Sequence, residues 1–444
     1  MRFSLICLGF ALCPLVSALS FQPAAERVAT QSSLSQASDS KGMKRFASRL
    51  IREFARLHPG RQLSYEAAEE RLVEAGSGLT IHLDNLYRDY KALTLHERRD
   101  FIEKTVLVFG RVEESIPPLA DVRNLLTLKI WPRSKWEWLD LNAQIGGAGS
   151  TPLAEAPQIW SLGQHLQGLL AIDGVDRIRY VGKDMLEDWK VPVAELHAEA
   201  QARVATLGQG WSTLGKSKVD GGTGRLFSVV GDDYFAASHL FDVEMLKSMK
   251  VVEGALAAVP SRETLLIVEP GDEKLQQLFL EQIEEAYRNG QRPLCPIPLV
   301  YRKGEWKTWN VPANHAQRVA FRNLEREYLA SEYDAQKKQL DLLYEARDID
   351  VHVSSFSLYG DEGTDEYTSL AVWTKTVDTF LPQVDYVAFV DLDRPEDEAF
   401  IGRMKWADFV THFGKHLKLD SARYPKRYLT QGYPSLKRIE ALVE

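Results

Sequence analysis

Residues 264–287 carry the sequence TLLIVEPGDEKLQQLFLEQIEEAY, in which a strand pattern is followed at once by a helix pattern. The run Thr264–Val268 is aliphatic and β-branched, which predicts a short buried strand. Asp272 can accept a hydrogen bond from a free backbone N–H group and so cap a helix. The apolar residues after it recur at helical spacing: Leu275, Leu278, Phe279, Ile283 and Tyr287. The segment therefore indicates a protein that combines strands and helices.

The chain before this segment alternates between the same two patterns. Helical spacing is found over 46–57, after the capping box Thr94–Glu97, after Val191-Pro192 and over 234–249. Strand patterns are found over 79–83, on both sides of the turn dipeptide Asp173-Gly174, and over 226–230. Two stretches have neither pattern. We expect a surface excursion over 133–166 and a glycine-rich loop over 208–224.

The chain after this segment predicts a second folded unit. Lys303-Gly304 lies between two strand patterns and indicates a hairpin turn. A helical pattern then continues from about Asn314 to Arg347, which is long enough to connect domains. Strands are predicted over 350–359, 367–376 and 386–392, and a helix over 404–416. We expect these elements to form a C-terminal α+β unit.

The first twenty residues are typical of a secretory signal peptide. Arg2 provides the basic start, and an apolar stretch of about 14 residues follows, which is shorter than the ~20 needed to span a bilayer. Val16 with Ala18, or Ala18 with Ser20, provides the residues at −3 and −1 that signal peptidase accepts. We expect cleavage near Ala18 or Ser20, a secreted or periplasmic protein, and no transmembrane segment in the mature chain.

Composition limits the classes of protein to which this chain can belong. Its 444 residues suffice for two or three domains, and 26% of them are charged, as in ordinary globular proteins. The formal net charge of −8 disfavours nucleic-acid binding, which requires a basic surface. Cys295 is the one cysteine outside the signal segment, so neither an intrachain disulfide nor a cysteine-based zinc site is expected. It lies in an apolar, proline-rich run and is expected to be a buried structural thiol.

These patterns together predict an α+β fold with mixed and antiparallel sheets, helices packed on one face, and two or more units. The segment 21–44 is rich in Ser, Ala and Gln, and we expect a flexible tether there. The expected organisation is a signal peptide at 1–20, the tether at 21–44, an α+β region at 45–310, a connecting helix at 311–348 and a C-terminal α+β unit at 349–444.

Four motifs occur in a fixed order in the central region. They are Leu83-Asp84-Asn85-Leu86-Tyr87-Arg88-Asp89-Tyr90 with Glu97-Arg98-Arg99, Arg179-Tyr180-Val181 with Leu186-Glu187-Asp188-Trp189, Gly231-Asp232-Asp233-Tyr234-Phe235-Ala236-Ala237-Ser238, and Val259-Pro260-Ser261-Arg262-Glu263-Thr264-Leu265-Leu266. Through them, about residues 79–310 resemble the YtpQ-like family, a bacterial domain of unknown function. The chain has His239 and Glu263 where that family has Arg and Asp. The resemblance implies an α+β fold and no activity, and the signal peptide and the C-terminal extension are additions to it.

The candidate catalytic residues lie at predicted loop ends. Arg262 and Glu263 stand at the start of a strand, where the guanidinium can bind a carboxylate or a phosphate. We favour instead an ion pair between Arg262 and Asp232 or Asp233 that fixes two loops. The two aspartates can hold a hard cation or act as acid and base, but a role as helix cap is favoured. With His239, these residues are weak candidates for a reaction centre.

Metal and phosphate motifs are incomplete. His412 and His416 are four residues apart on a predicted helix and can share a metal, but Phe413 stands where the zincin pattern requires Glu. The run Gly221–Gly224 lacks the Lys-Ser/Thr of a phosphate-binding loop. The acidic runs 361–366 and 391–398 lack EF-hand spacing and are expected to be solvated turns. We therefore expect no cofactor.

The sequence favours an exported protein, of unknown specific function, that binds or scaffolds and does not catalyse. Its partner would be an unidentified protein or an envelope component. The alternative is an extracytoplasmic hydrolase, favoured if its candidate residues meet in one accessible pocket: Arg262, Asp232, Asp233 and His239. A third hypothesis is a surface-polymer binder that uses Trp136, Trp138 or Trp306.

Overall fold

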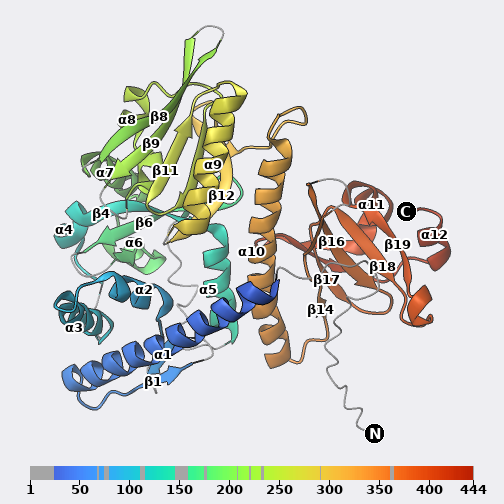
Figure 1. Ribbon diagram of the computed structural model, residues 1–444, viewed down its shortest axis with the longest axis horizontal. Helices are drawn as coiled ribbons and strands as arrows, with labels where there is room; N and C mark the ends of the chain where they lie inside the picture. Colours follow the sequence, from blue (N-terminus) through green and yellow to red (C-terminus); the bar gives the residue numbers. More distant parts are fainter. Residues whose placement is uncertain are drawn as a thin grey trace. The chain divides into compact units, whose positions relative to one another are not determined.

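The computed structural model describes residues 25–67, 70–74, 80–110, 116–145, 159–174, 178–207, 209–219, 222–231, 235–290, 292–360 and 365–443. The predicted signal peptide lies outside the described residues. Helices are combined with antiparallel and mixed sheets, which confirms the α+β prediction (Figure 1). The chain divides into two compact units, one formed by 1–76 with 80–110, and the other by 77–79 with 111–444.

The first unit is built on the helix α1. This helix spans Ala25–Leu57, so the tether prediction is wrong from Ala25 onwards. Its buried face begins at Met43 and continues through Phe46, Leu50 and Phe54. Ala, Gln and Lys are good helix formers, and no proline occurs between Ala25 and Leu57. The helix can therefore continue from Met43 toward the N-terminus. The other elements are β1 (Leu63–Glu66), β2 (Arg71–Glu74), β3 (Thr80–His82), α2 (Asp84–Ala92) and α3 (Glu97–Gly110).

The predicted capping box opens α3. The backbone N–H of Thr94 donates to the Glu97 carboxylate at 2.9 Å, and the N–H of Glu97 lies 3.5 Å from the Thr94 hydroxyl oxygen. Ile102, Thr105 and Val106 are buried on the predicted face of the helix. Local chemistry alone was sufficient to place this helix.

The second unit begins with two sheets that share one apolar core. The smaller sheet has the order β4-β6-β5, with β7 also paired to β6. The larger sheet has the order β13-β12-β10-β11-β9-β8 and is antiparallel at every pairing. Aliphatic side chains of both sheets meet in the core, together with the helix α7. The strands are β4 (Leu126–Pro132), β5 (Ile159–Leu162), β6 (Leu166–Asp173), β7 (Ile178–Tyr180), β8 (Gln209–Val219), β9 (Gly222–Gly231), β10 (Leu256–Ser261), β11 (Thr264–Val268), β12 (Pro293–Arg302) and β13 (Glu305–Thr308).

The helix α9 (Glu273–Asn289) lies against the other face of the larger sheet (Figure 1). Asp272 caps it, because its carboxylate accepts a hydrogen bond from the N–H of Leu275 at 2.9 Å. Phe279 and Ile283 are buried against the sheet. The strand and capped helix predicted for 264–287 are thus confirmed. The remaining helical segments of this region are α4 (Leu119–Val122), α5 (Arg133–Ile145), α6 (Lys183–Trp189), α7 (Val193–Thr206), η3 (Ala237–Phe241) and α8 (Val243–Ser248).

Two regions that were predicted to be irregular, 133–166 and 208–224, contain helix and strand. Residues 209–219 form β8 at the edge of the sheet, not a loop, because backbone pairing with β9 compensates for their polar side chains. Gly222 and Gly224 belong to β9 and so lie in extended backbone, while Gly221 is outside the described residues. Residues 133–145 form α5 in place of a surface excursion, with Leu141 fully buried. The helix predicted over 234–249 is interrupted at Asp242, which caps the short helix α8.

Both predicted hairpins are present. β12 and β13 are joined at Lys303 and Gly304, and both residues have positive φ, of 52° and 82°. That backbone fits a two-residue hairpin turn. β6 also pairs with β7, but Asp173 lies opposite Ile178, so the connection is longer than the predicted two-residue turn.

The long helix α10 spans Arg318–Ala346, within the range where a long helix was predicted. It contacts α5 and β12 on one side and the C-terminal strands on the other (Figure 1). Those strands form two mixed sheets, with orders β14-β17-β21-β20 and β15-β16-β18-β19. The elements are β14 (His352–Val353), β15 (Ser357–Gly360), β16 (Tyr367–Thr374), β17 (Thr379–Pro382), β18 (Tyr386–Val390), η4 (Glu396–Glu398), β19 (Phe400–Lys405), α11 (Trp406–Phe413), η5 (Gly414–His416), β20 (Leu417–Asp420), β21 (Arg427–Thr430) and α12 (Leu436–Glu440).

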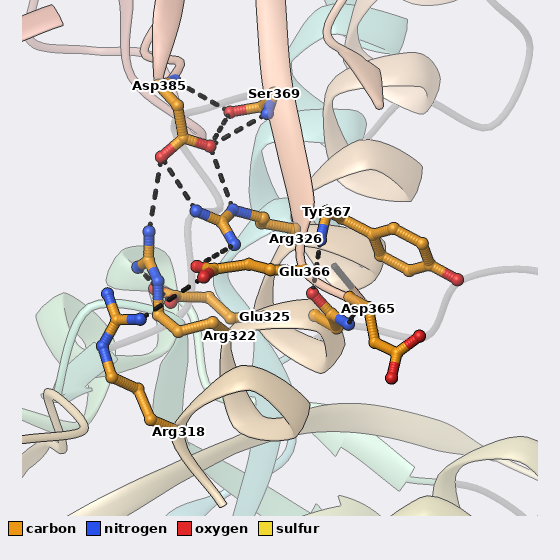
Figure 2. Close-up of polar contacts among 10 residues, drawn as sticks. Arg318, Arg322, Glu325, Arg326, Asp365, Glu366, Tyr367, Ser369 and Asp385 are labelled. Atoms are coloured by element: carbon orange, nitrogen blue, oxygen red, sulfur yellow. Dashed lines mark hydrogen bonds and ion pairs between the residues drawn. The ribbon is translucent and has the colours of Figure 1, made fainter. Parts of the chain in front are cut away.

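An ion-pair network joins α10 to the C-terminal strands (Figure 2). Arg326 is only 7% exposed and donates to the Asp385 carboxylate from Nε at 2.9 Å and from Nη2 at 3.1 Å. Its third nitrogen donates to Glu366 at 3.0 Å. Asp385 also accepts the Ser369 hydroxyl at 2.7 Å. Arg318, Arg322 and Arg326 of α10 therefore hold the helix on the sheet through Glu366 and Asp385.

We expect Asp385→Ala to lower the free energy of unfolding by about 3 kcal/mol, because it leaves most of the buried Arg326 guanidinium without its partner. Burial raises the pKa of Asp385 and the hydrogen bonds from Arg326 and Ser369 lower it, with a net value below 3.8. The stabilisation is thus present above pH 3.8 and is lost as the pH falls through the folded-state pKa. Urea denaturation measures both effects.

The matched control is Asp334→Ala, which removes the exposed pair with Lys338 on the same helix. It should change stability by less than about 0.5 kcal/mol. Equal losses in the two variants would contradict a special role for the Arg326 network.

Candidate functional site

Arg262 and Glu263 form the turn between β10 and β11. The N–H of Arg262 donates to the Arg292 carbonyl at 3.0 Å, and the Arg262 carbonyl accepts from the N–H of Ala237 at 3.2 Å. Glu263 pairs with the Arg292 side chain at 3.2 Å. Glu263 therefore ties the turn to the start of β12, which is a structural role.

The predicted partners of Arg262 cannot be placed beside it. Asp232 and Asp233 lie outside the described residues, so their ion pair with Arg262 and their role as caps stay predictions. Within the described ranges, the Arg262 guanidinium has no ion pair or hydrogen bond. Its positive charge acts to lower the pKa of Lys129, Lys135 and Tyr180.

His239 is in the protein interior. Its side chain is 0% exposed, and its Nδ1 lies 3.5 Å from the Asp242 carboxylate. Burial lowers the pKa of His239, and Asp242 opposes this effect only in part. The carboxylate of Asp242 is also occupied, since it accepts from the N–H of Met245 at 2.9 Å. A ring in this position has no contact with solvent through which it could activate a water molecule.

The two metal-ligand candidates do not share a helix face. The helix α11 begins at Trp406 and not at 404, and it ends at Phe413. His416 lies in the following 3-10 turn, with its Nδ1 3.0 Å from the Gln431 carbonyl oxygen. No group of three or more His, Cys, Asp or Glu side chains that could hold a metal is found in the described part of the chain.

The acidic runs are partly buried, contrary to the prediction of solvated turns. Asp391 is 1% exposed and pairs with Lys375 at 3.1 Å. Glu366 pairs with Arg326, and residues 361–364 lie outside the described residues. Cys295 is fully buried as expected, and burial raises the pKa of its thiol.

A cavity of about 460 Å³ lies between the smaller sheet and the edge of the larger one. Of the three tryptophans singled out from the sequence, Trp306 lines it, whereas Trp136 and Trp138 are half-buried on α5. The described lining comes from β5, α7, η3, α8, β12 and β13: Ser161, Leu162, Gln201, Leu240, Phe241, Val243, Leu246, Lys247, Val251, Tyr301, Gly304, Glu305 and Trp306.

The cavity walls combine apolar and polar surface in comparable amounts. The Trp306 indole N–H is buried and has no hydrogen-bond partner. Gln201 already donates to the Phe241 carbonyl at 2.8 Å, and Lys247 pairs with Glu244 at 2.8 Å. Glu305 lies 3.3 Å from Lys307. The cavity can therefore hold an apolar group and offer one hydrogen bond to an acceptor on it.

Of these lining residues, only Trp306 was singled out from the sequence. The aliphatic side chains are the same residue types as in the core, and they come from six elements that only the tertiary fold brings together. Their spacing in the chain cannot distinguish a cavity wall from a packed interior.

Comparison of the chain with models of protein families, with curated proteins and with solved structures finds no match. The YtpQ-like resemblance therefore stays a prediction. In the part of the chain that the structure describes, the helices are all too short or too polar to cross a bilayer.

The burial of His239 predicts a pH dependence of stability. Its folded-state pKa is below 6.5, so the unfolded chain binds a proton that the folded chain does not as the pH falls below 6.5. Stability should fall by at most about 1.4 kcal/mol per pH unit from this group. In urea denaturation between pH 7.5 and 5, His239→Phe should reduce the slope of stability against pH. An unchanged slope in His239→Phe would show that His239 titrates as an exposed imidazole.

Proposed function

We propose that this protein is an exported binding protein that holds a small, mainly apolar ligand in the cavity beside Trp306 and does not transform it. Two observations carry the proposal: a cavity of about 460 Å³ that Trp306 lines, and the buried indole N–H of the same residue, which has no hydrogen-bond partner in the described part of the chain. A buried donor without an acceptor costs about 1–3 kcal/mol. A ligand with an apolar body and one acceptor atom removes that cost and fills the cavity.

Binding without catalysis is supported by the charged groups. Lys247 and Glu305, the charged residues among the described lining, each have an ion-pair partner outside the cavity. The hydrolase alternative requires His239 at a water-accessible surface, and that ring is fully buried. The proposal thus keeps binding as the function and places the site at Trp306, not at the hydrolase candidates near Arg262.

Export is part of the same proposal, and it is supported by the pattern of the first twenty residues. A secreted or periplasmic location would place the cavity outside the cytoplasm. The binding partner is then a small envelope or extracellular molecule, or an envelope component that carries such a group.

The cavity is tested by filling it. Val251 lines the cavity and Val252 does not, and Val252 is 46% exposed. We expect the wild type to bind the fluorescent probe 8-anilino-1-naphthalenesulfonate at one saturable site. Val251→Phe should weaken binding at least about tenfold because the ring occupies the volume of the probe. Val252→Phe should bind as the wild type does, with thermal melting to confirm that both variants fold.

The hydrogen bond is tested separately with Trp306→Phe. The substitution keeps an aromatic ring, smaller than the indole, and removes the N–H, so the affinity for the same probe should fall at least about fivefold, the equivalent of one neutral hydrogen bond. Trp211→Phe on β8, an exposed tryptophan that is not part of the described lining, serves as control. Absence of saturable binding, or equal binding by Val251→Phe and Val252→Phe, would refute the proposed site.

Export is tested by expression of the full chain in a bacterial host with an intact secretion pathway. The protein recovered from the periplasm or the medium should begin at Leu19 or Phe21, as read by N-terminal sequencing. A mature protein that begins at Met1 and remains with the cytosolic fraction would contradict the proposal of export.

A further inference from the structure

A row of polar side chains lies on one face of the smaller sheet. Thr127 and Lys129 are two residues apart on β4, so they point to the same side. The register places Lys129 opposite Leu169 and Trp131 opposite Gln167, so Gln167 of β6 shares this side as a diagonal neighbour of Lys129. The three side chains are 0%, 6% and 5% exposed, respectively.

None of these three buried groups has a hydrogen-bond partner. The unpaired atoms are the Thr127 hydroxyl oxygen, the Lys129 ammonium nitrogen and the Gln167 amide nitrogen. Lys129 Nζ lies 3.2 Å from the centroid of the Phe235 ring, which offers a cation–π contact and no acceptor atom. Each unpaired buried donor costs about 1–3 kcal/mol, more for a charged one, so a cluster of three indicates a missing acceptor.

The charges around this row are mainly positive. Arg262 on the β10–β11 turn and Arg203 on α7 both act on Lys129, and Asp173 at the end of β6 acts in the opposite direction. Burial, with the two arginines, lowers the pKa of Lys129 to about 7. Arg203 donates to the Asn124 carbonyl, but the Arg262 guanidinium has no ion pair within the described ranges. Among the described residues that act on Lys129, one carboxylate is thus opposed by two arginine side chains.

We propose that Lys129, Gln167 and Arg262 form a binding site for a small oxyanion, a phosphate or a carboxylate group. The site is distinct from the cavity at Trp306, and none of its residues lines that cavity.

The chemistry of the donor set selects the ligand class. Lys, Arg and the amide nitrogen of Gln are donors, so they suit an acceptor-rich anion and repel a metal cation. A guanidinium and an ammonium together are the usual partners of phosphate and carboxylate oxygens. A water molecule could accept one of these hydrogen bonds, but it would leave the excess positive charge uncompensated. Tyr180, opposite Ala171 on the same face, can donate a further hydrogen bond.

The test is the effect of inorganic phosphate on thermal stability at pH 7, with sodium chloride at matched ionic strength as reference. Phosphate at 100 times its dissociation constant should raise the Tm of the wild type by about 3 °C or more. Lys129→Met should lose this shift, and isothermal titration calorimetry should show at least a tenfold weaker binding. Lys338→Met, an exposed lysine of α10, should keep the full shift.

Lys129→Met is expected to fold, because it replaces an unpaired buried charge with an apolar side chain of similar length. Arg262→Gln, in a half-buried turn, provides a second variant that should also lose the shift. Acetate in place of phosphate distinguishes a carboxylate site from a phosphate site. The proposal is overturned if neither anion stabilises the wild type, or if the two anions stabilise Lys129→Met and the wild type equally.

Discussion

The arrangement of the second unit depends on two buried arginines that hold the C-terminal strands on α10. Arg326 reaches outward from the helix to Asp385 and Glu366, and Arg427 reaches back from β21. Arg427 is 0% exposed and donates to Gln336 at 2.6 Å, to the Ser354 carbonyl at 2.8 Å and to the Phe380 carbonyl at 2.9 Å. An unpaired buried guanidinium is strongly unfavourable. These contacts therefore favour a single packing arrangement of the C-terminal strands on α10.

The requirement that buried polar groups have hydrogen-bond partners also separates structural from functional polar groups. Arg326, Asp385 and Arg427 have their hydrogen-bonding capacity filled by protein atoms, so they have none left for a ligand. Lys129 and the Trp306 indole are buried without a polar partner. A folded protein tolerates such groups where a ligand supplies the missing hydrogen-bond acceptor, because elsewhere an unpaired buried donor only reduces stability.

The sequence predicted the elements whose signals are local. The cap at Asp272, the box at Thr94 and the turn at Lys303-Gly304 each depend on neighbours a few residues apart, and each is confirmed. It missed β8 and α5, whose stability comes from pairing and burial against distant segments. It also missed both proposed sites, because Lys129 and Gln167 lie far apart in the chain and only the β4–β6 register makes them neighbours. The sequence did single out Arg262, and the partners predicted for it lie outside the described residues.

The short segment from Phe235 to Phe241 connects the two proposed sites. Phe235 lies over Lys129, and the N–H of Ala237 donates to the carbonyl of Arg262, so its first half belongs to the oxyanion site. Phe241 and its neighbour Leu240 line the cavity, so its second half belongs to the apolar site. The two proposed sites therefore share this segment, and a ligand that displaced it in one site would displace lining residues of the other. Any coupling that results is reciprocal: an oxyanion that changes the affinity of the cavity must itself be bound more or less tightly by the same factor when the cavity is filled.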